Sequence, residues 1–441
     1  MRGRIFLCVT CLLVPVIGRG QTPQKRDSVA KADSIARADS IALVRTLEKE
    51  LGSAGADTGG VVAAPRPIGG YMNIGFVATM DAGWSTADDV DALQPGDHDP
   101  KVRGFTIPNT EISLDGAVDP YFKGFANILF KINSEGETVV ELEEAFALTS
   151  SLPANLQLKA GQFFAEFGRQ NVQHPHAWAF VDQPLVLNRM FGPEGLRSQG
   201  MRLSWLLPTS FYSEAMVGVM NSTGGTTASF RSPESHEIHG GTIDEDPVKA
   251  FGDLLIVPRF ATSFDISETQ TVLLGASAAF GPNNSGSSAR TKIFGVDGYW
   301  KWKPAAAQQG FPFVSMQAEA MLRRYDASER SFFDSPDIIL PAETLKDRGA
   351  YAQLLWGIKP RIVAGLRGDW VSRDDNGNDG VFESEIRGDR FRLSPNFTLY
   401  PTEFSKFRVQ YNYDDRKGIG TDHSLWFQFE FLLGAHASHK F

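Results

Sequence analysis

Residues 424–441 read SLWFQFEFLLGAHASHKF, a stretch in which large apolar side chains occupy alternate positions. The odd positions carry Leu425, Phe427, Phe429, Phe431 and Leu433, and the even positions carry Trp426, Gln428 and Glu430. A period of two predicts a strand with one apolar face and one mixed face. A soluble protein rarely ends on such a strand, because an unpaired aromatic edge invites aggregation. The stretch therefore predicts a strand whose edges are both paired.

Composition narrows the class of protein. The chain has 441 residues, among them 43 glycines and 32 phenylalanines, and its formal net charge is −9. This length fits two or three ordinary domains or one large all-β barrel. The acidic balance argues against a nucleic-acid-binding protein, which needs a basic surface.

The first twenty residues predict a signal peptide (1–20). Arg2 and Arg4 precede an apolar run, 5–18, which is too short for a membrane-spanning helix. The alternative is an uncleaved anchor. Cleavage near Gly20 removes Cys8 and Cys11, so the mature chain has no disulfide and no cysteine metal ligand. It also removes three arginines, which takes the formal charge from −9 to −12.

Residues 21–51 predict a periplasmic helical arm. A six-residue unit that begins Asp-Ser repeats three times in 27–44, and Val44, Leu47 and Leu51 follow heptad-like spacing. Alanine, lysine and arginine favour helix. Two alternatives remain open: a solvated helical linker, or a short coiled coil that joins protomers. Residues 52–67 are rich in glycine and alanine and predict a flexible linker.

Residues 68–441 predict an outer-membrane β-barrel. Strand-like alternation recurs over about ten residues, for example in 122–132, 314–325 and 406–414, which is the length of a tilted membrane-crossing strand. Sixteen candidate strands are joined by gaps that alternate in length. The long polar gaps fall near 80–105, 168–198, 221–250, 281–290, 326–347, 372–388 and 415–422, and the tight turns near 118–121, 152–155, 207–210, 266–269, 358–361 and 400–403.

This alternation is typical of a closed transmembrane antiparallel β-barrel of about 16 strands. The last strand then pairs with the first, and its phenylalanines meet lipid. The competing interpretation is a soluble β-sandwich or propeller, which would bury the apolar face and need not alternate its loop lengths. The fold class is thus all-β, with a short N-terminal helical or coiled-coil segment.

The third long loop, 168–198, is too apolar to extend into water. It contains Trp178, Phe180, Leu185, Met190 and Phe191, and burying each is worth about 1.5–3 kcal/mol. We expect it to fold inward and narrow the pore, since a barrel of this size leaves an aqueous lumen. Its predicted constriction charges are Arg169, Asp182, Arg189, Glu194 and Arg197. The alternative is a loop that caps the barrel rim or packs between protomers.

Strand phase predicts which charged side chains line the inner wall. The inward phase carries Lys123, Lys131, Lys159, Lys406 and Arg408, which favour anions at the wall. Acidic residues of the first loop, including Asp97 and Asp99, are expected at a solvated surface. Both signs occur at the predicted constriction, so ion preference does not follow from counting.

Histidines offer a weak metal signal. His174 and His176 lie in the third long loop, and His236 and His239 lie in the fourth. Closely spaced neutral imidazoles bind zinc or copper, yet spacing fixes no third ligand. The chain shows none of the glycine-rich, G-x-S-x-G or HExxH motifs. His423 and Ser424 point to opposite faces of a strand. We therefore expect no enzyme and no cofactor.

Two stretches resemble a known group of proteins. FGRQNVQHPHAWAFVDQPLV (167–186) with GPEGLRSQGMRLSWLLP (192–208), and the ending FLLGAHASHKF (431–441), are similar to porin-type Gram-negative outer-membrane proteins, distantly related to phosphate-selective porins. The resemblance implies a sixteen-stranded channel, a constricting third loop and a homotrimer. It also implies that barrel assembly machinery recognises the last strand through Phe441. Phosphate-selective relatives line their pores with a ladder of arginines, and no comparable ladder was traced in this sequence.

The sequence therefore predicts a porin in the cell outer membrane that lets small hydrophilic solutes or ions diffuse passively. The alternative is a non-conducting barrel whose external loops bind metal or a partner. The expected partners are membrane lipid, the assembly machinery and small solutes, and no nucleic acid.

Overall fold

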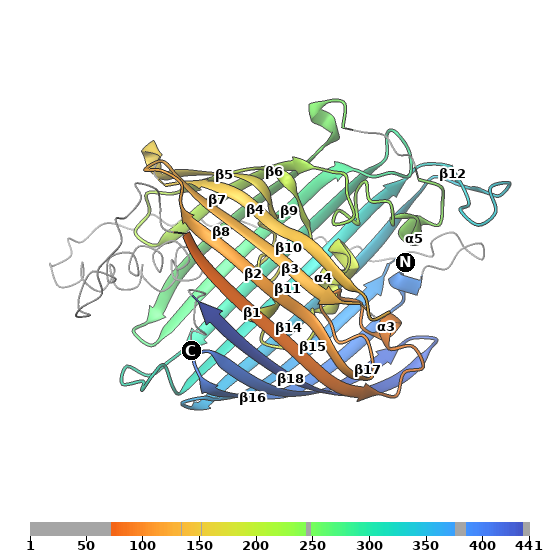
Figure 1. The fold of residues 1–441 in the computed structure, drawn as a ribbon. Coiled ribbons are helices and arrows are strands. Elements are labelled where there is room, and N and C mark those ends of the chain that lie inside the picture. The colour runs from red at the N-terminus through yellow and green to blue at the C-terminus, as the bar shows by residue number, and fades with distance from the viewer. Residues whose placement is uncertain (1–71, 134, 151, 244–247, 375–384, 435–441) are drawn as a thin grey trace, which may run out of the picture.

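The computed structural model describes residues 72–133, 135–150, 152–243, 248–374 and 385–434. The predicted signal peptide (1–20), arm (21–51) and linker (52–67) lie outside these residues, as does Phe441. Within them, sixteen antiparallel strands close into a tilted barrel (Figure 1). The barrel strands are β1 (Met72–Ser85), β2 (Gly104–Ala117), β3 (Phe122–Ile132), β4 (Thr138–Thr149), β5 (Leu156–Phe164), β6 (Arg197–Leu206), β7 (Tyr212–Asn221), β8 (Leu254–Ser267), β9 (Gln270–Pro282), β10 (Arg290–Trp302), β11 (Phe313–Ala327), β14 (Glu343–Lys359), β15 (Ile362–Arg373), β16 (Arg390–Thr402), β17 (Ser405–Arg416) and β18 (Gly420–Gly434).

The connections between the barrel strands contain short helices, 3₁₀ turns and one pair of short strands. They are the helices α3 (Val90–Leu93), α4 (Leu185–Phe191) and α5 (His236–His239), the 3₁₀ turns η1 (Pro153–Asn155), η2 (Pro175–Ala177), η3 (Phe251–Asp253) and η4 (Glu385–Arg387), and the small pair β12 (Arg330–Ser331) and β13 (Ile339–Leu340). No helix among the described residues is both long enough and apolar enough to cross a membrane.

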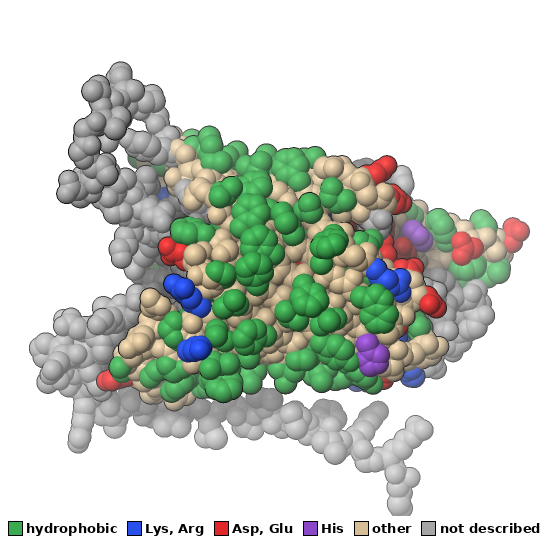
Figure 2. Space-filling model, turned by 60° about the horizontal axis from the view of Figure 1, so that its bottom comes forward, with side chains coloured by type: hydrophobic (Ala, Val, Ile, Leu, Met, Phe, Trp, Pro, Cys, Tyr) green, Lys and Arg blue, Asp and Glu red, His purple; other side chains and the backbone are tan. Residues whose placement is uncertain are grey.

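The last strand closes the barrel, as its alternation predicts. β18 pairs with β1 from Gly75 opposite Gly434 to Ser85 opposite Ser424. Phe427 is 50% exposed on the outer face, whereas the neighbouring Trp426 is fully buried inside. Trp426 lies over Gly83 of β1, where a Cβ atom would overlap its indole ring. On the face that Figure 2 shows, apolar side chains are spread over the middle of the barrel and charged ones lie toward its two ends.

The loops alternate in length as predicted, with one difference. The two exceptions that the sequence itself indicates are present: the connection 133–137 is short for the long-loop end, and 303–312 is long for the turn end. The gap predicted near 415–422 shortens to 417–419, because β17 and β18 continue pairing up to Arg416 opposite Gly420. In outer-membrane barrels the short turns face the periplasm and the long loops face outward.

Candidate functional site

Residues 165–196, here called the inner loop, connect β5 to β6 and pack against the inner wall. The helix α4 in this loop is buried through its apolar side chains Leu185, Val186, Met190 and Phe191. They form one apolar cluster with inward side chains of seven strands: Met220, Leu255, Val257, Ala279, Ile293, Met321, Tyr351 and Val371. Figure 1 shows α4 within the outline of the barrel. The apolar composition of this loop is therefore accounted for by a core inside the barrel.

Asp182 ties the inner loop to β15, β16 and β17. Its carboxylate is fully buried and accepts hydrogen bonds from Arg367 (2.6 Å), Arg392 (2.8 Å), Gln410 (2.9 Å) and Asn412 (2.6 Å). Burial alone would raise the pKa of Asp182, but the two guanidinium groups outweigh it and lower the pKa to about 2. In this arrangement Asp182 holds the loop instead of facing water.

Arg189 makes a second buried anchor. Its guanidinium donates to Asp347 of β14 at 3.2 Å and to the backbone carbonyl of Arg387 at 3.0 Å. Arg323 of β11 donates to Asp347 at 2.7 Å and to the Arg189 carbonyl at 2.9 Å. Burial lowers the pKa of Arg189 to about 10. The predicted constriction charge is thus neutralised in a network between loop and wall.

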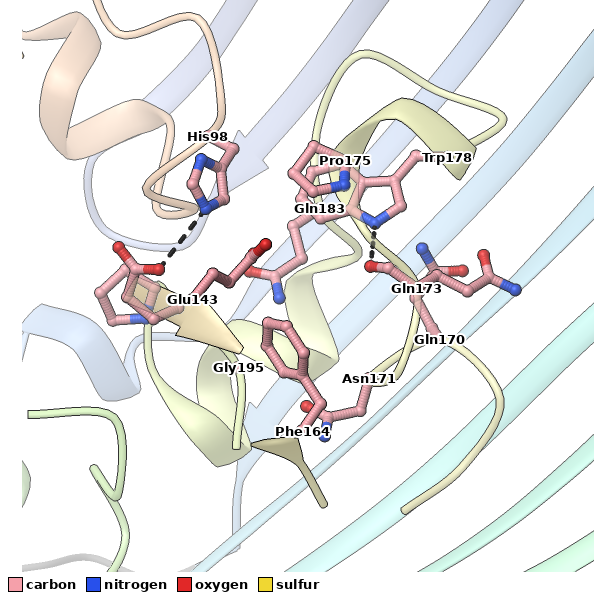
Figure 3. A pocket seen from close by; sticks show the side chains of 12 residues that line it. His98, Glu143, Phe164, Gln170, Asn171, Gln173, Pro175, Trp178, Gln183 and Gly195 are labelled. Carbon is pink, nitrogen blue, oxygen red and sulfur yellow. Dashed lines mark hydrogen bonds and ion pairs between the residues drawn. The ribbon is translucent and has the colours of Figure 1, made fainter. Parts of the chain in front are cut away.

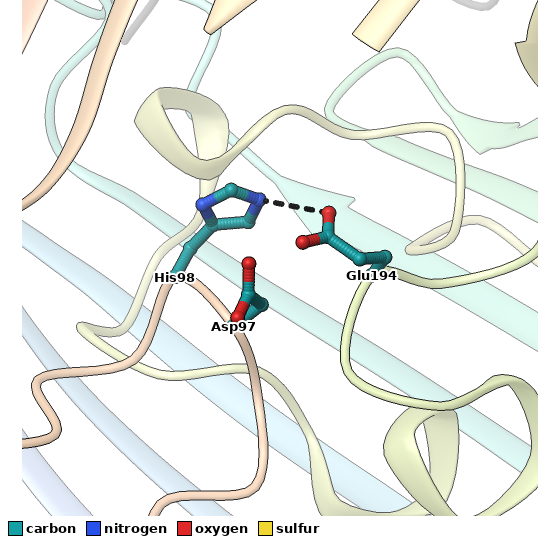
Figure 4. Close-up of side chains that lie close together, drawn as sticks. All are labelled: Asp97, His98 and Glu194. Atoms are coloured by element: carbon teal, nitrogen blue, oxygen red, sulfur yellow. Dashed lines mark ion pairs between the residues drawn. The ribbon is translucent and has the colours of Figure 1, made fainter. Parts of the chain in front are cut away.

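Glu194 and Arg197 lie in a third group, together with Lys131 of the wall. Lys131 Nζ is 2.8 Å from Glu194 and also pairs with Asp97. Arg197 pairs with Glu141 of β4, and His98 Nε2 is 3.4 Å from Glu194 (Figure 4). Burial lowers the pKa of His98, but Glu194 outweighs burial and raises this pKa to about 9. The structure therefore brings together three predicted residues that sequence spacing could not join.

The fifth predicted constriction charge, Arg169, is partly exposed. Its guanidinium lies 4.3 Å from the centre of the Tyr299 ring, and its Nε donates to Gln317 at 3.0 Å. The backbone amides of Arg169 and Gln170 donate to Glu319, which fixes the start of the loop on β11.

The predicted wall cations lie on the inner face and are held by partners. Lys159 pairs with Glu166 at 3.1 Å, and Lys406 pairs with Glu430 at 2.9 Å. Arg408 donates to Gln428 at 2.8 Å. Lys123 shares the inward phase of Asn127 on β3 and is partly exposed.

Further inward arginines were not traced from the sequence. They are Arg202, Arg259, Arg323, Arg367 and Arg392, which are buried and bonded to carboxylates. Each occupies an inward position of a strand whose outward positions are mostly apolar. The alternation along these strands could therefore have predicted that the arginines point inward.

Two acidic residues of the first loop correct the expectation of a solvated surface. Asp99 is buried and accepts from the backbone amides of Gly96 (2.9 Å) and Gln183 (2.8 Å), so it joins the first loop to the inner loop. Asp97 pairs with Lys131. Burial and the nearby Asp182 raise the pKa of Asp99 to about 6. Sequence alone could not find these contacts, because loop-to-loop packing leaves no periodic pattern.

The four histidines separate into two environments. His236 stacks on Phe333 with ring centroids 4.4 Å apart, and His239 is buried beside Tyr325. Burial, reinforced by Arg330, lowers the pKa of His239 to about 3. His174 and His176 instead face carboxylates: His174 Nδ1 is 2.8 Å from Glu143, and His176 Nδ1 is 3.0 Å from Glu111. Burial opposes charge on His174, yet Glu143, Glu144 and Glu111 raise its pKa well above the ordinary value.

A small cavity lies between the first loop, the inner loop and β4. Its volume is about 10 Å³, the space of roughly one water molecule. Figure 3 shows His98, Glu143 and Trp178 around it. The lining residues are His98, Glu143, Phe164, Gln170, Asn171, Gln173, Pro175, Trp178, Gln183, Pro193, Glu194 and Gly195.

Carboxylates dominate the surroundings of this cavity. Glu111, Glu141, Glu143 and Glu144 come from β2 and β4, and Asp97 and Glu194 come from the two loops. Lys131 and Arg197 are the lysine and arginine bonded to this group. These strand carboxylates are not among the predicted site residues. The signal was present, since acidic residues within a membrane-crossing strand must point to the lumen.

Comparisons with known proteins agree with this fold. No model of a known protein family matches the chain. An uncharacterized protein of Aquifex aeolicus strain VF5 is 32% identical over an alignment of 356 residues that covers 77% of this chain and 70% of the relative. The outer-membrane channel DcaP of Acinetobacter baumannii has a TM-score of 0.53 at 14% identity, over 85% of this chain and 100% of DcaP.

An anion-selective porin from Comamonas acidovorans has a TM-score of 0.51 at 8% identity, over 82% of this chain and 100% of that porin. At these identities the two structures share the fold alone. A closed antiparallel barrel whose outer face is apolar fits the outer membrane, so the protein belongs in the outer membrane of a Gram-negative bacterium.

Proposed function

Because this chain belongs to the same family as the Aquifex aeolicus protein, whose name assigns no activity, we propose its function from the site: a porin for passive diffusion of small hydrophilic solutes or ions. The inner loop is its constriction. The observation that carries this proposal is the charged inner wall, to which Asp182, Arg189 and Glu194 tie the loop. A barrel that served only as an anchor would need no such wall.

The constriction favours cations. The group around the small cavity carries six carboxylates from β2, β4 and both loops, against four cations: Lys131, Arg197, and His98 and His174, whose raised pKa values keep them charged. Charged rings at a constriction set ion preference. The inward lysines and arginines elsewhere are paired with acids or amides and leave little net positive field.

Single-channel conductance of the mature protein in a planar bilayer tests the proposal. We expect ohmic steps, a reversal potential of the sign for cations under a salt gradient, and a larger conductance when 170–196 is deleted. Shortening loop 328–342, at the same end of the barrel, is the control and should leave the conductance unchanged. A folded barrel that never conducts, with or without 170–196, would refute the porin.

A specific observation favours a second candidate, the non-conducting barrel. Inward side chains of β15–β18 such as Arg367, Asp369, Gln410 and Glu430 are buried, so the inner loop fills that side of the lumen. If the deletion variant conducts and the full chain does not, the barrel is closed at rest and its loops carry the function.

Assembly completes the proposal. We infer a homotrimer from the resemblance to porins. The molecular mass of the protein in detergent tests this inference. The last strand and Phe441 are proposed to be recognised by the barrel assembly machinery, so that Phe441→Ala should lower insertion into the membrane.

A further inference from the structure

Three neighbouring strands and the inner loop bring oxygen and nitrogen donors to one point of the lumen. Glu111 is on β2, Asn127 on β3 and Glu143 on β4, and His174 comes from the inner loop. Glu143 and Glu144 are consecutive, so a regular strand would point them to opposite faces. The register of β4 against β3 shifts at this place, and both carboxylates are buried. A β-bulge of this kind re-aims side chains and is common beside functional sites.

The donor atoms have the spacing of metal ligands. His174 Nδ1 is 2.8 Å from Glu143 Oε2 and 3.7 Å from Glu111 Oε2. Ligands at 2.0–2.2 Å from a tetrahedral ion lie roughly 3.3 Å apart. Asn127 Nδ2 sits among the three, 3.2 Å from Glu111 Oε2, 2.6 Å from Glu143 Oε2 and 3.0 Å from His174 Nδ1. Its amide nitrogen thus occupies the point on which the three donors converge.

The other nitrogen of His174 has the partner that metal-binding histidines use. Nε2 is 2.9 Å from Glu144 Oε2. A carboxylate on the second ring nitrogen fixes the tautomer, leaves the first nitrogen as a ligand and raises its basicity. The bulge therefore gives two adjacent residues different roles: Glu143 offers a ligand atom for a metal ion, and Glu144 positions His174.

Two buried oxygens of this group of side chains are among the atoms without a hydrogen-bond partner in the described part of the chain. They are Glu143 Oε1 and Asn127 Oδ1, on side chains that are each 1% exposed. Leaving buried polar atoms unbonded is costly, and such atoms call for an ion or a water molecule. An ion at the point of convergence displaces the Asn127 amide nitrogen, and a change of side-chain rotamer that moves the amide aside can turn Oδ1 toward the ion as a fourth ligand atom. The side chains of His174 and His176 are 15% and 17% exposed, which provides access from water.

We propose that Glu111, Glu143 and His174 bind a divalent first-row transition-metal ion of the zinc type, with Asn127 as an additional oxygen donor and Glu144 positioning His174. An imidazole with carboxylates suits zinc and its neighbours better than calcium or magnesium, which prefer oxygen ligands alone. The group Asp97, His98 and Glu194 is also compact, but Lys131 already supplies its cation.

Zn²⁺ titration of the untagged mature protein in detergent, followed by calorimetry, tests this site. We expect one equivalent bound. Glu143→Gln and His174→Gln should each weaken binding at least tenfold, and Glu144→Gln about 10–100-fold. His236→Gln is the matched control and should bind as the wild type does. Co²⁺ should give a visible absorption band that His174→Gln loses.

A gain-of-function variant covers the case in which these changes impair folding. Asn127→Asp adds a fourth carboxylate to the group, so we expect a lower unfolding temperature without Zn²⁺ and a larger rise on its addition than in the wild type. Absence of Zn²⁺ binding by the wild type would overturn the site. Binding that depends on His236 but not on Glu143 or His174 would overturn it as well. None of these measurements requires conduction, so the site and the porin stand or fall separately.

Discussion

At the scale of single residues, two glycines of the inner wall decide where the inner loop can sit. A Cβ atom on Gly295 of β10 would lie 2.5 Å from the Phe167 ring, and one on Gly349 of β14 would lie 2.9 Å from Val186. Phe167 and Val186 are fully buried. The wall is therefore recessed where the loop is bulky, and the fit depends on the absence of two methyl groups.

Gly295→Ala should loosen the loop without changing the barrel. Its methyl group forces Phe167 to move, and overpacking of this kind costs about 1–3 kcal/mol. We expect a lower unfolding temperature, followed by the heat-dependent mobility shift of the barrel on gels. Gly368→Ala on β15 is the control, because nothing lies within 4 Å of the added atom. Equal unfolding temperatures for both variants would contradict the recessed seat.

At the scale of elements, the two faces of β18 lie in two different environments. Its outward row meets lipid, while Trp426, Gln428 and Glu430 are buried inside. Gln428 accepts from Arg408, and Glu430 pairs with Lys406, so both inward polar groups bond to β17. The alternation in the sequence thus reports two different environments and not a single amphipathic surface.

Phe427→Arg should weaken insertion of β18 more than Leu433→Arg does. Both positions face outward, but Phe427 lies at the middle of the strand and Leu433 near its end. A charge on the lipid face costs about 2–4 kcal/mol at the bilayer midplane and about 0–1 near the interface. Reversible refolding into vesicles measures the difference. Equal costs at the two positions would place the strand at a different depth.

At the scale of the whole molecule, Asp182 connects the inner loop to β15, β16 and β17, three strands near the C-terminal end of the sequence. Asp182→Asn leaves Arg367 and Arg392 without their buried counter-charge, and breaking such a pair costs about 3–5 kcal/mol. The unfolding temperature should fall accordingly at neutral pH.

The ion pairs of Asp182 with Arg367 and Arg392 also predict that the stability of the folded protein depends on pH. Because the pKa of Asp182 is lowered from 3.8 to about 2 in the folded protein, its stabilisation is complete above the unfolded value. It is lost as the pH falls from about 4 to about 2. The gap between wild type and Asp182→Asn should be constant from pH 6.5 to 8 and should close below pH 4. A gap that stays open at pH 2 would show that Asp182 is not anchored by its charge.

The sequence predicted the parts of this molecule that periodicity encodes. Strand phase placed the outward phenylalanines and the inward Lys406 and Arg408, and composition showed that the stretch around Phe191 must be packed. It could not pair Asp182 with Arg392, since residues 210 positions apart leave no local pattern. The β4 bulge was also hidden, because a strict period of two sends Glu143 and Glu144 to opposite faces.

The anchoring of Asp182 also sets an order in time. Its partners lie on β15, β16 and β17, and Asn412 is 230 residues further along the chain. Contacts of such separation form late and slowly. The loop reaches its final position only when β15, β16 and β17 are in place to bind Asp182. A barrel whose strands have paired but whose loop is not yet seated would expose the apolar side chains of α4 inside the lumen, so the seated state also protects the chain from aggregation.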